Sequence, residues 1–173
     1  GCAICHNGPL LSDQKFYALG LPAFGPGRTR RWDPIPRDVG RMGETDNLDD
    51  AYRFKTPSLR NVALTGPYGH NGAYPTLEGI VRHHLDPVKM RTTWKRDMAA
   101  LPSVPWLEEI DFVIQSDLYE MARQGSKLDI LPRNLSEHQI KDIVAFLESL
   151  TGKNALKGRL GEPDAVPSGL SID

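Results

Sequence analysis

The sequence has few cysteines, no long apolar run and no excess of charge of one sign. Its two cysteines cannot supply the second pair of ligands that a cysteine-rich zinc site needs. No apolar stretch is long enough to span a bilayer, so no transmembrane segment is expected. The 21 lysines and arginines nearly balance the 22 aspartates and glutamates, which gives no overall signature of a nucleic-acid-binding or membrane-surface protein. The length of 173 residues suits one domain.

Both cysteines lie in one short motif at the beginning of the chain, Gly1-Cys2-Ala3-Ile4-Cys5-His6. The spacing C-x-x-C-H is the attachment signature of a c-type haem, in which each thiol adds to a haem vinyl group and the histidine becomes the proximal iron ligand. The alternatives are a chance match, a zinc half-site without its second pair of ligands, and a redox C-x-x-C, which belongs in a βαβ pattern that the sequence lacks. We therefore expect one covalent haem c on Cys2, Cys5 and His6, and no disulfide.

Covalent haem attachment also indicates where the protein is located and what has to cover the haem. It takes place after export, so we expect a periplasmic or otherwise extracytoplasmic bacterial protein. Small c-type cytochromes cover the apolar haem face with a helix that precedes the motif, whereas only Gly1 precedes Cys2. We therefore expect something outside the sequence to cover that face, most simply the N-terminal part of a longer polypeptide.

Glycine and proline make up 30 of the 173 residues and are concentrated between residues 20 and 75. Residues 21–27 and 32–36 can form neither a helix nor a central strand, and a haem crevice is a suitable object for such irregular loops to wrap. The one local basic stretch lies in and beside these loops: Arg28, Arg30, Arg31, Arg37 and Arg41. Prolines and an aspartate interrupt this stretch, and it lacks the aromatic interleaving of a nucleic-acid platform. It is therefore read as a solvated loop whose arginines pair with carboxylates or haem propionates.

The clearest predicted helix spans Ser136 to Leu150. Ser136 and Gln139 form an S-x-x-Q capping box, and Thr151-Gly152 ends the helix. One apolar stripe at helical spacing follows the box: Ile140, Ile143, Val144, Leu147 and Leu150. In a c-type haem protein such a terminal helix packs across the haem-binding segment, although an ordinary amphipathic helix has the same pattern.

A second predicted helix begins at Thr76, which is a suitable N-cap. Four residues of this helix are spaced at i, i+3, i+4 and i+7 and therefore lie on one face: Leu77, Ile80, Val81 and His84. His83 is rotated from that face by about 100° and is expected to point off the apolar stripe. Because a distal haem ligand has to come from a buried face, His84 is the candidate for the sixth iron ligand. The alternative reading is a core histidine with ordinary hydrogen bonds.

A third segment, roughly Val104 to Gln124, is mostly apolar with partial helical spacing. We expect it to form core or an interdomain cover and not a cofactor site. Methionine is also an iron ligand in c-type cytochromes. Of the four methionines in the chain, Met42 and Met90 are the alternatives to His84.

Two further motifs carry a resemblance to a known family. They are F-K-T-P-S-L-R-N at residues 54–61 and P-Y-G-H-N-G at residues 67–72, followed by T-L-E at residues 76–78. Together with C-x-x-C-H, these motifs resemble the C-terminal haem domain of bacterial dihaem cytochrome c peroxidases and of the MauG-type dihaem enzymes that oxidise tryptophan residues in partner proteins. The resemblance covers Gly1 to about Leu85 and the final helix to Gly152.

The resemblance implies a mainly α, class I cytochrome c-like haem domain with long irregular loops. The domain spans residues 1–152, with an insertion at about 87–133 that is longer than the family pattern, and residues 153–173 form a C-terminal extension. In the family, a second haem domain packs against this one and reacts with peroxide. It also holds the catalytic glutamate and the tryptophan between the haems, so the catalytic residues are left unknown for this chain.

The family places the distal ligand of this haem 14 residues beyond the histidine of the P-Y-x-H motif, as methionine in the peroxidases and tyrosine in MauG. Counting from His70 reaches His84, the residue that the helical face also selects. An imidazole in place of a thioether lowers the haem potential and gives a low-spin bis-histidine iron. If His84 does not bind, the iron is open or water-ligated.

The resemblance assigns three further residues near the haem. His70 lies beside it, close to the propionates or the domain interface, and is not an iron ligand. Family members hold a calcium ion between the haems through backbone carbonyls at positions matching Thr65 and Pro67, and such oxygens are suitable hard ligands. Calcium is therefore a possible second cofactor, completed by a side chain of the other domain.

Three functions agree with these observations. The first is the electron-transfer haem domain of a dihaem peroxidase-like oxidoreductase, which reduces hydrogen peroxide with electrons from a small cytochrome c or cupredoxin. The second is a MauG-like oxidase of a protein or organic substrate, which the non-methionine ligand favours. The third is a non-catalytic c-type cytochrome subunit of a larger electron-transfer assembly, since a six-coordinate iron cannot bind peroxide without losing a ligand. The expected partner in the first two is a second haem domain or subunit, and nucleic acid is expected in none.

Overall fold

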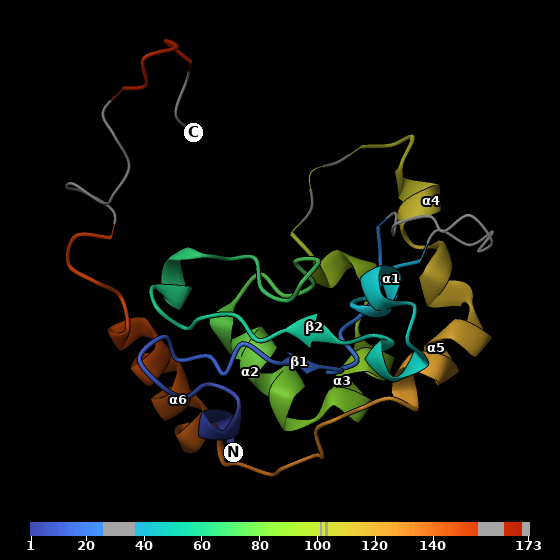
Figure 1. Ribbon diagram of the computed structural model, residues 1–173, viewed down its shortest axis with the longest axis horizontal. Helices are drawn as coiled ribbons and strands as arrows, with labels where there is room; N and C mark the ends of the chain where they lie inside the picture. Colours follow the sequence, from blue (N-terminus) through green and yellow to red (C-terminus); the bar gives the residue numbers. More distant parts are fainter. Residues whose placement is uncertain (26–36, 101, 103, 156–164, 171–173) are drawn as a thin grey trace.

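The computed structural model describes residues 1–25, 37–100, 102, 104–155 and 165–170, and most of its regular structure is helical (Figure 1). The α-helices are α1 (Met42–Thr45), α2 (Leu77–Leu85), α3 (Pro87–Thr93), α4 (Glu108–Asp111), α5 (Leu118–Gly125) and α6 (Glu137–Ser149). The 3-10 helices are η1 (Cys2–Ile4), η2 (Leu48–Asp50), η3 (Val62–Leu64), η4 (Arg96–Met98) and η5 (Val113–Ser116). The predicted mainly α fold is confirmed.

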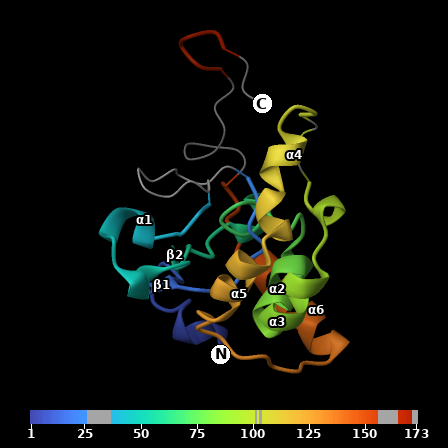
Figure 2. The same ribbon diagram turned by 90° about the vertical axis from the view of Figure 1, so that its right-hand side faces the viewer.

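Two short strands, β1 (Phe16–Tyr17) and β2 (Phe54–Lys55), form an antiparallel pair. Figure 2 shows the strands and α1 on one side of the molecule and α2, α3 and α6 on the other. Ser12 reinforces the strand pair, because its buried hydroxyl donates to the carbonyl of Thr56 at 2.7 Å. These contacts fasten the segment that follows the C-x-x-C-H motif to the segment that contains F-K-T-P.

Helix α6 has the predicted capping box. Ser136 Oγ accepts from the backbone N–H of Gln139 at 3.3 Å, and Gln139 Oε1 accepts from the N–H of Ser136 at 2.9 Å. The helix packs against α2, and the core between them consists of apolar side chains from both helices and η3: Val62, Leu77, Val81, Ile140 and Leu147. Leu77 and Val81 of the predicted α2 stripe therefore meet the stripe of α6 in one core, whereas Ile80 packs against the separate cluster of Ala73, Tyr74 and Trp94.

The predicted N-cap of α2 is also confirmed, since Thr76 Oγ1 accepts from the N–H of Gly79 at 3.1 Å. Asp86 then ends α2 and caps α3, where its carboxylate accepts from the N–H of Lys89 at 2.9 Å. Pro87 occupies the first turn of α3, where its missing N–H costs nothing. The chain thus turns sharply directly after the candidate ligand His84.

The third apolar segment is not one helix but three short pieces, α4, η5 and α5. Asp117 is the reason for the last break, because its side chain caps α5 and accepts from the N–H of Glu120 at 2.9 Å. Ile114 is buried, but Trp106, Leu118 and Tyr119 are 75%, 80% and 82% exposed. The expectation of core is therefore wrong for most of this segment, and its role as an interdomain cover stays a prediction.

Of the five arginines in the basic stretch, Arg28, Arg30 and Arg31 lie outside the described residues. Arg37 pairs with Glu120, and Arg41 pairs with Asp50 at 3.2 Å, as expected for a loop whose arginines bind carboxylates. The described part also excludes residues 26–36, which include most of the predicted irregular loops. It excludes residues 156–164 and 171–173 of the predicted C-terminal extension as well. No helix among the described residues has the length and apolarity that crossing a membrane requires.

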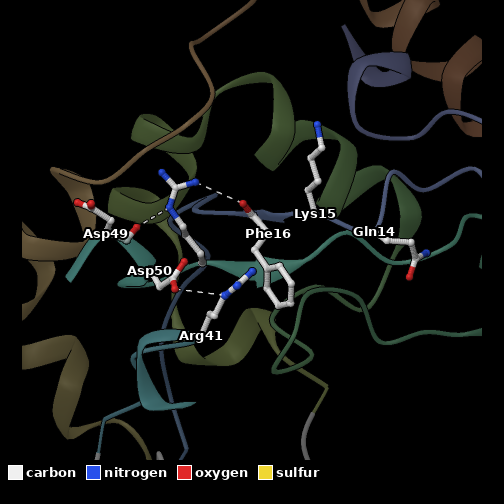
Figure 3. Close-up of a pocket in the computed structure, with 7 residues that line it drawn as sticks. Gln14, Lys15, Phe16, Arg41, Asp49 and Asp50 are labelled. Atoms are coloured by element: carbon white, nitrogen blue, oxygen red, sulfur yellow. Dashed lines mark hydrogen bonds and ion pairs between the residues drawn. The ribbon is translucent and has the colours of Figure 1, made fainter. Parts of the chain in front are cut away.

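An open pocket lies where β1, α1 and η2 come together (Figure 3). Its lining is mostly charged: Gln14, Lys15, Phe16, Arg41, Asp49, Asp50 and Arg53. The Arg41 guanidinium stacks over the Phe16 ring at 4.3 Å, and Arg53 Nε donates to the Asp49 carbonyl at 2.7 Å. None of the predicted haem-attachment, iron-ligand or calcium-ligand residues lines this pocket, although Arg41 of the basic stretch does.

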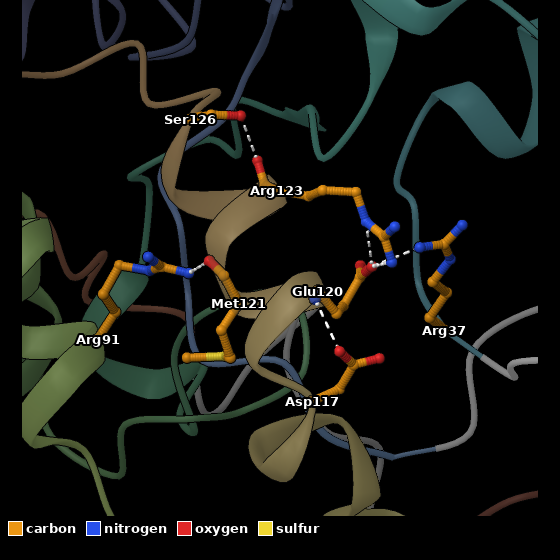
Figure 4. Close-up of polar contacts among 7 residues, drawn as sticks. All are labelled: Arg37, Arg91, Asp117, Glu120, Met121, Arg123 and Ser126. Carbon is orange, nitrogen blue, oxygen red and sulfur yellow. Dashed lines mark hydrogen bonds and ion pairs between the residues drawn. The ribbon is translucent and has the colours of Figure 1, made fainter.

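Glu120 on α5 is a fully buried carboxylate held by two guanidinium groups (Figure 4). Its Oε2 accepts hydrogen bonds from Arg37 and from Nε and Nη2 of Arg123, the latter two at 3.0 and 2.7 Å. Burial alone would raise the pKa of Glu120, but the Tyr52 hydroxyl, Arg123 and Arg37 outweigh it and lower this pKa. The cluster ties the predicted insertion to the segment before α1.

We predict that Glu120→Gln lowers the free energy of unfolding by about 2 kcal/mol at neutral pH, because it removes the anion that Arg37 and Arg123 share. A depressed carboxyl pKa stabilises the folded state above the unfolded-state pKa, and this contribution is lost as the pH falls through the folded-state pKa. The difference between wild type and variant in urea denaturation should therefore shrink below the ordinary glutamate pKa of 4.5. The control Glu137→Gln removes a 70% exposed partner of Arg82 and should cost less than about 0.5 kcal/mol. An equal cost for both variants would contradict the prediction.

Candidate haem-binding site

The C-x-x-C-H motif forms a single turn at the beginning of the chain. The backbone N–H groups of Cys5 and His6 both donate to the carbonyl of Cys2, at 3.3 and 2.9 Å. Both cysteines are free thiols, with Cys2 exposed and Cys5 partly exposed. One turn of backbone therefore presents two accessible thiols and an imidazole, which is the arrangement that two thioethers and one axial ligand require.

The ring of His6 is oriented by the chain that follows it. Its Nδ1 lies 3.1 Å from the carbonyl oxygen of Leu11. A carbonyl only accepts hydrogen bonds, so Nδ1 carries the proton and Nε2 keeps its lone pair. Histidines that bind metals commonly have this arrangement, because the backbone bond fixes both the tautomer and the ring direction.

His84 has the same hydrogen bond pattern. Its Nδ1 donates to the carbonyl of Ile80 at 2.8 Å, one turn earlier in α2, and Nε2 again keeps its lone pair. Burial lowers the pKa of His84, the bond to Ile80 opposes this, and His6 lowers the pKa further. The two imidazoles are therefore near enough to interact, and His84 is neutral at physiological pH, as an iron ligand has to be.

His83 is the more deeply buried of the two neighbouring histidines, with no exposed surface. Its Nε2 donates to the carbonyl of Leu19 at 2.8 Å, and its Nδ1 accepts from the hydroxyl of Tyr74 at 2.9 Å. Burial, opposed by the Leu19 bond, lowers its pKa to about 4, so the ring is neutral. Because both nitrogens are engaged, His83 is not available to iron.

The helical spacing therefore predicts the orientation of His83 only in part. His83 does lie off the stripe that faces α6, but it does not point away from the protein, because α2 is buried on a second side. Leu19 and Tyr74 cover that side. The sequence does not reveal the hydrogen bond between the Tyr74 hydroxyl and His83, because a spacing of nine residues does not indicate a contact.

The methionine alternatives lie in other parts of the core. Met42 packs with Val39, Ala51 and Tyr52. Met90 packs against the cluster of Ala73, Tyr74 and Trp94, where Trp94 also stacks on Phe24 at 5.2 Å. Neither belongs to the core between α2 and α6, and the choice of His84 over both stays a prediction.

The residues of this region fit a covalent haem. The donor set consists of two free thiols on one turn and two imidazoles whose Nε2 atoms have no hydrogen bond among the described residues. Apolar surface is present on the same segment, where Ile4 is 71% and Leu10 is 50% exposed. A porphyrin attached to Cys2 and Cys5 would cover such surface.

His70 lies between an aromatic ring and an acid. Its ring stacks on Phe54, with centroids 3.6 Å apart, and its Nε2 is 3.7 Å from a carboxylate oxygen of Asp38. Burial lowers the pKa of His70, and Asp38 opposes this effect. These contacts hold the ring in place, and its predicted position beside the haem stays a prediction.

The predicted calcium ligands are backbone carbonyls in the turn that follows η3. Among the described residues, no hydrogen bond is donated to the carbonyl oxygen of Thr65 or Pro67. Both oxygens are therefore available to a hard cation. The described residues contain no group of three or more histidine, cysteine, aspartate or glutamate side chains that could hold a metal by themselves.

Comparison with known proteins identifies relatives, although no protein-family model matches the chain. The cytochrome-c peroxidase IdrP1 of Denitromonas iodatirespirans is 34% identical over 170 residues, which are 87% of this chain and 37% of that protein. The cytochrome c peroxidase Ccp of Escherichia coli (strain K12) is 45% identical over 84 residues, or 47% of this chain and 17% of that protein. The methylamine utilization protein MauG of Methylophilus methylotrophus is 30% identical over 112 residues, or 65% of this chain and 30% of that protein.

The fold has a counterpart among solved structures. The crystal structure of a MauG-like protein associated with microbial copper homeostasis matches 94% of this chain and 46% of that chain, with a TM-score of 0.62 and 24% identity. Fold and donor set together define a mainly α, cytochrome c-like haem domain. The chain belongs to the family of bacterial dihaem cytochrome c peroxidases and MauG, and it corresponds to their C-terminal c-type haem domain. It spans well under half the length of the relatives that it matches.

Proposed function

We propose that this chain is the electron-transfer haem domain of a peroxidase-like oxidoreductase, which reduces hydrogen peroxide with electrons from a small cytochrome c or cupredoxin. The observation that carries the proposal is the matched pair His6 and His84, each with Nδ1 bound to a backbone carbonyl and Nε2 free. The haem, when bound, supplies one-electron redox chemistry. Cys2 and Cys5 would hold it through thioether bonds, and His6 and His84 would be the ligands of its iron.

Two axial imidazoles leave no position for peroxide, so peroxide chemistry belongs elsewhere. We place it at a second haem in another domain or subunit, in a periplasmic protein. The peroxidase relatives support this assignment. The carbonyls of Thr65 and Pro67 would contribute to a calcium site, and His70 would stand beside the haem, held by Phe54 and Asp38.

A MauG-like oxidase acting on a protein or organic substrate is the second candidate. The specific observation in its favour is the identity of residue 84. A histidine ligand gives a lower haem potential than the methionine ligand of the peroxidases, which suits a different electron donor or substrate.

The assignment is tested by exposing the holoprotein to small iron ligands. We expect the purified chain with its covalent haem to bind cyanide weakly and to turn over hydrogen peroxide slowly, because both axial positions are filled. The absorption spectrum during a cyanide titration and the rate of peroxide consumption measure these properties. Tight cyanide binding together with rapid peroxide turnover would make this haem the peroxide site and would overturn the proposal.

A further inference from the structure

Arg91 on α3 places its guanidinium in a narrow space between α5 and the segment that follows β1. Its Nη2 donates to the carbonyl of Met121 on α5 (Figure 4). A Cβ atom at Gly125 would lie 2.4 Å from Nη1, so the side chain approaches α5 as closely as only a glycine permits. A Cβ atom at Gly20 would lie 3.5 Å from Cδ and Nε on the other side. The guanidinium is thus enclosed by two glycines.

Among the described residues, this guanidinium has no acidic partner. Nε is buried without a hydrogen bond, and no ion pair joins Arg91 to a carboxylate among the described residues. Arg37, Arg53 and Arg82, by contrast, all pair with carboxylates. Burial lowers the pKa of Arg91, but a guanidinium starts from so high a value that it stays charged. Within the part of the chain that the structure describes, Arg91 is therefore a partly buried positive charge without a neighbouring anion.

The charge lies close to the histidine pair. Gly20, against which Arg91 packs, directly follows Leu19, whose carbonyl accepts the hydrogen bond of His83. His83 in turn precedes His84, and their ring centroids are 6.4 Å apart. The other group that faces His83 is the hydroxyl of Tyr74, which is neutral.

We propose that Arg91 raises the reduction potential of the haem held by His6 and His84, and so offsets the lowering that a second imidazole ligand causes. A fixed positive charge disfavours the more positive ferric state relative to the ferrous state, and it does so most strongly where water is excluded. Arg91 acts through the field at the iron and not by ligation. The inference rests on the ligand pair of the proposed function.

The test measures the haem potential by spectroelectrochemical titration of the holoprotein in four forms. Arg91→Gln removes the charge but keeps an amide donor for the Met121 carbonyl, and it should shift the potential downward. For scale, two unit charges on the order of 10 Å apart at an effective dielectric constant of about 20 interact strongly enough to change the ratio of reduced to oxidised haem by roughly tenfold. Arg91→Lys keeps the charge and should restore most of the wild-type potential. Arg82→Gln, which removes an arginine paired with Glu78 and Glu137, should leave it nearly unchanged.

Two outcomes would overturn the proposal. One is a wild-type potential in Arg91→Gln, and the other is an equal shift in Arg91→Lys, which would reveal a packing effect instead of a charge effect. Should Arg91→Gln fail to fold, Leu128→Glu tests the charge independently. Leu128 also packs against Gly20, so a carboxylate at position 128 should pair with Arg91 and lower the haem potential. An unchanged potential in that variant would count against the proposal. The EPR spectrum of the oxidised wild type reports the iron ligands separately, so failure of the proposed function is distinguishable from failure of this inference.

Discussion

Replacing Cys2 and Cys5 together by alanine should abolish covalent haem binding. The chain contains no other cysteine, so no second thiol can take over either thioether bond. The free energy of unfolding should fall as well, because Ile4 and Leu10 then have no porphyrin to cover their exposed apolar surface. Haem content is measured after expression in a host that matures c-type cytochromes. The measurements are the pyridine haemochrome spectrum of the denatured protein and the intact mass.

Single variants are the internal control for this experiment. Cys2→Ala and Cys5→Ala each leave one thiol on the same turn and should retain part of the covalent haem through one thioether. Covalent haem in the double variant would contradict the assignment of the motif. It would also remove the basis for treating the chain as a c-type haem domain.

Replacing His84 by methionine should change the iron from bis-imidazole to imidazole–thioether ligation and raise the haem potential. The thioether is the softer ligand and favours the ferrous state, as in cytochromes with methionine–histidine ligation. EPR of the oxidised holoprotein and redox titration measure the two effects. The wild type should give a low-spin bis-imidazole signal that disappears in the variant.

Two controls separate ligation from general disturbance. His83→Gln removes a buried histidine whose nitrogens are both engaged, and it should keep the low-spin signal although it destabilises the fold. His138→Gln alters an 86% exposed side chain on α6 and should change neither signal nor stability. A high-spin wild type, or a signal that persists in His84→Met, would leave the iron open. This haem would then be a candidate for the peroxide site.

Local spacing predicts much of the site because the chemistry needs neighbours in sequence. The two thiols and His6 have to share one turn, so the motif itself defines their geometry. The caps of α2 and α6 are equally local, since Thr76 and Ser136 bind backbone groups three residues away. His84 follows from the same periodicity, because residues seven apart lie on one face of a helix.

The errors fall where contacts come from distant parts of the chain. His83 is buried by Leu19, 64 residues away, and this contact has no local signal. The segment from 104 to 124 is as apolar as a protein core, yet Trp106 and Tyr119 are exposed, and the charged Glu120 is buried between Arg37 and Arg123. Composition states how much apolar surface exists, and tertiary packing decides which of it is covered.

The sequence by itself therefore determined the haem motif, the helix that presents His84 and the membership of a dihaem peroxidase and MauG family, since each depends on residues within a few turns of one another. Only the tertiary structure decided which nitrogens of the neighbouring histidines remain free and where the charge of Arg91 lies. The first depends on the carbonyl of Leu19, which engages Nε2 of His83, and the second on the glycines at positions 20 and 125. Hydrogen bonds and close approaches between distant segments exist only after the chain has folded, so no local pattern in the sequence marks them.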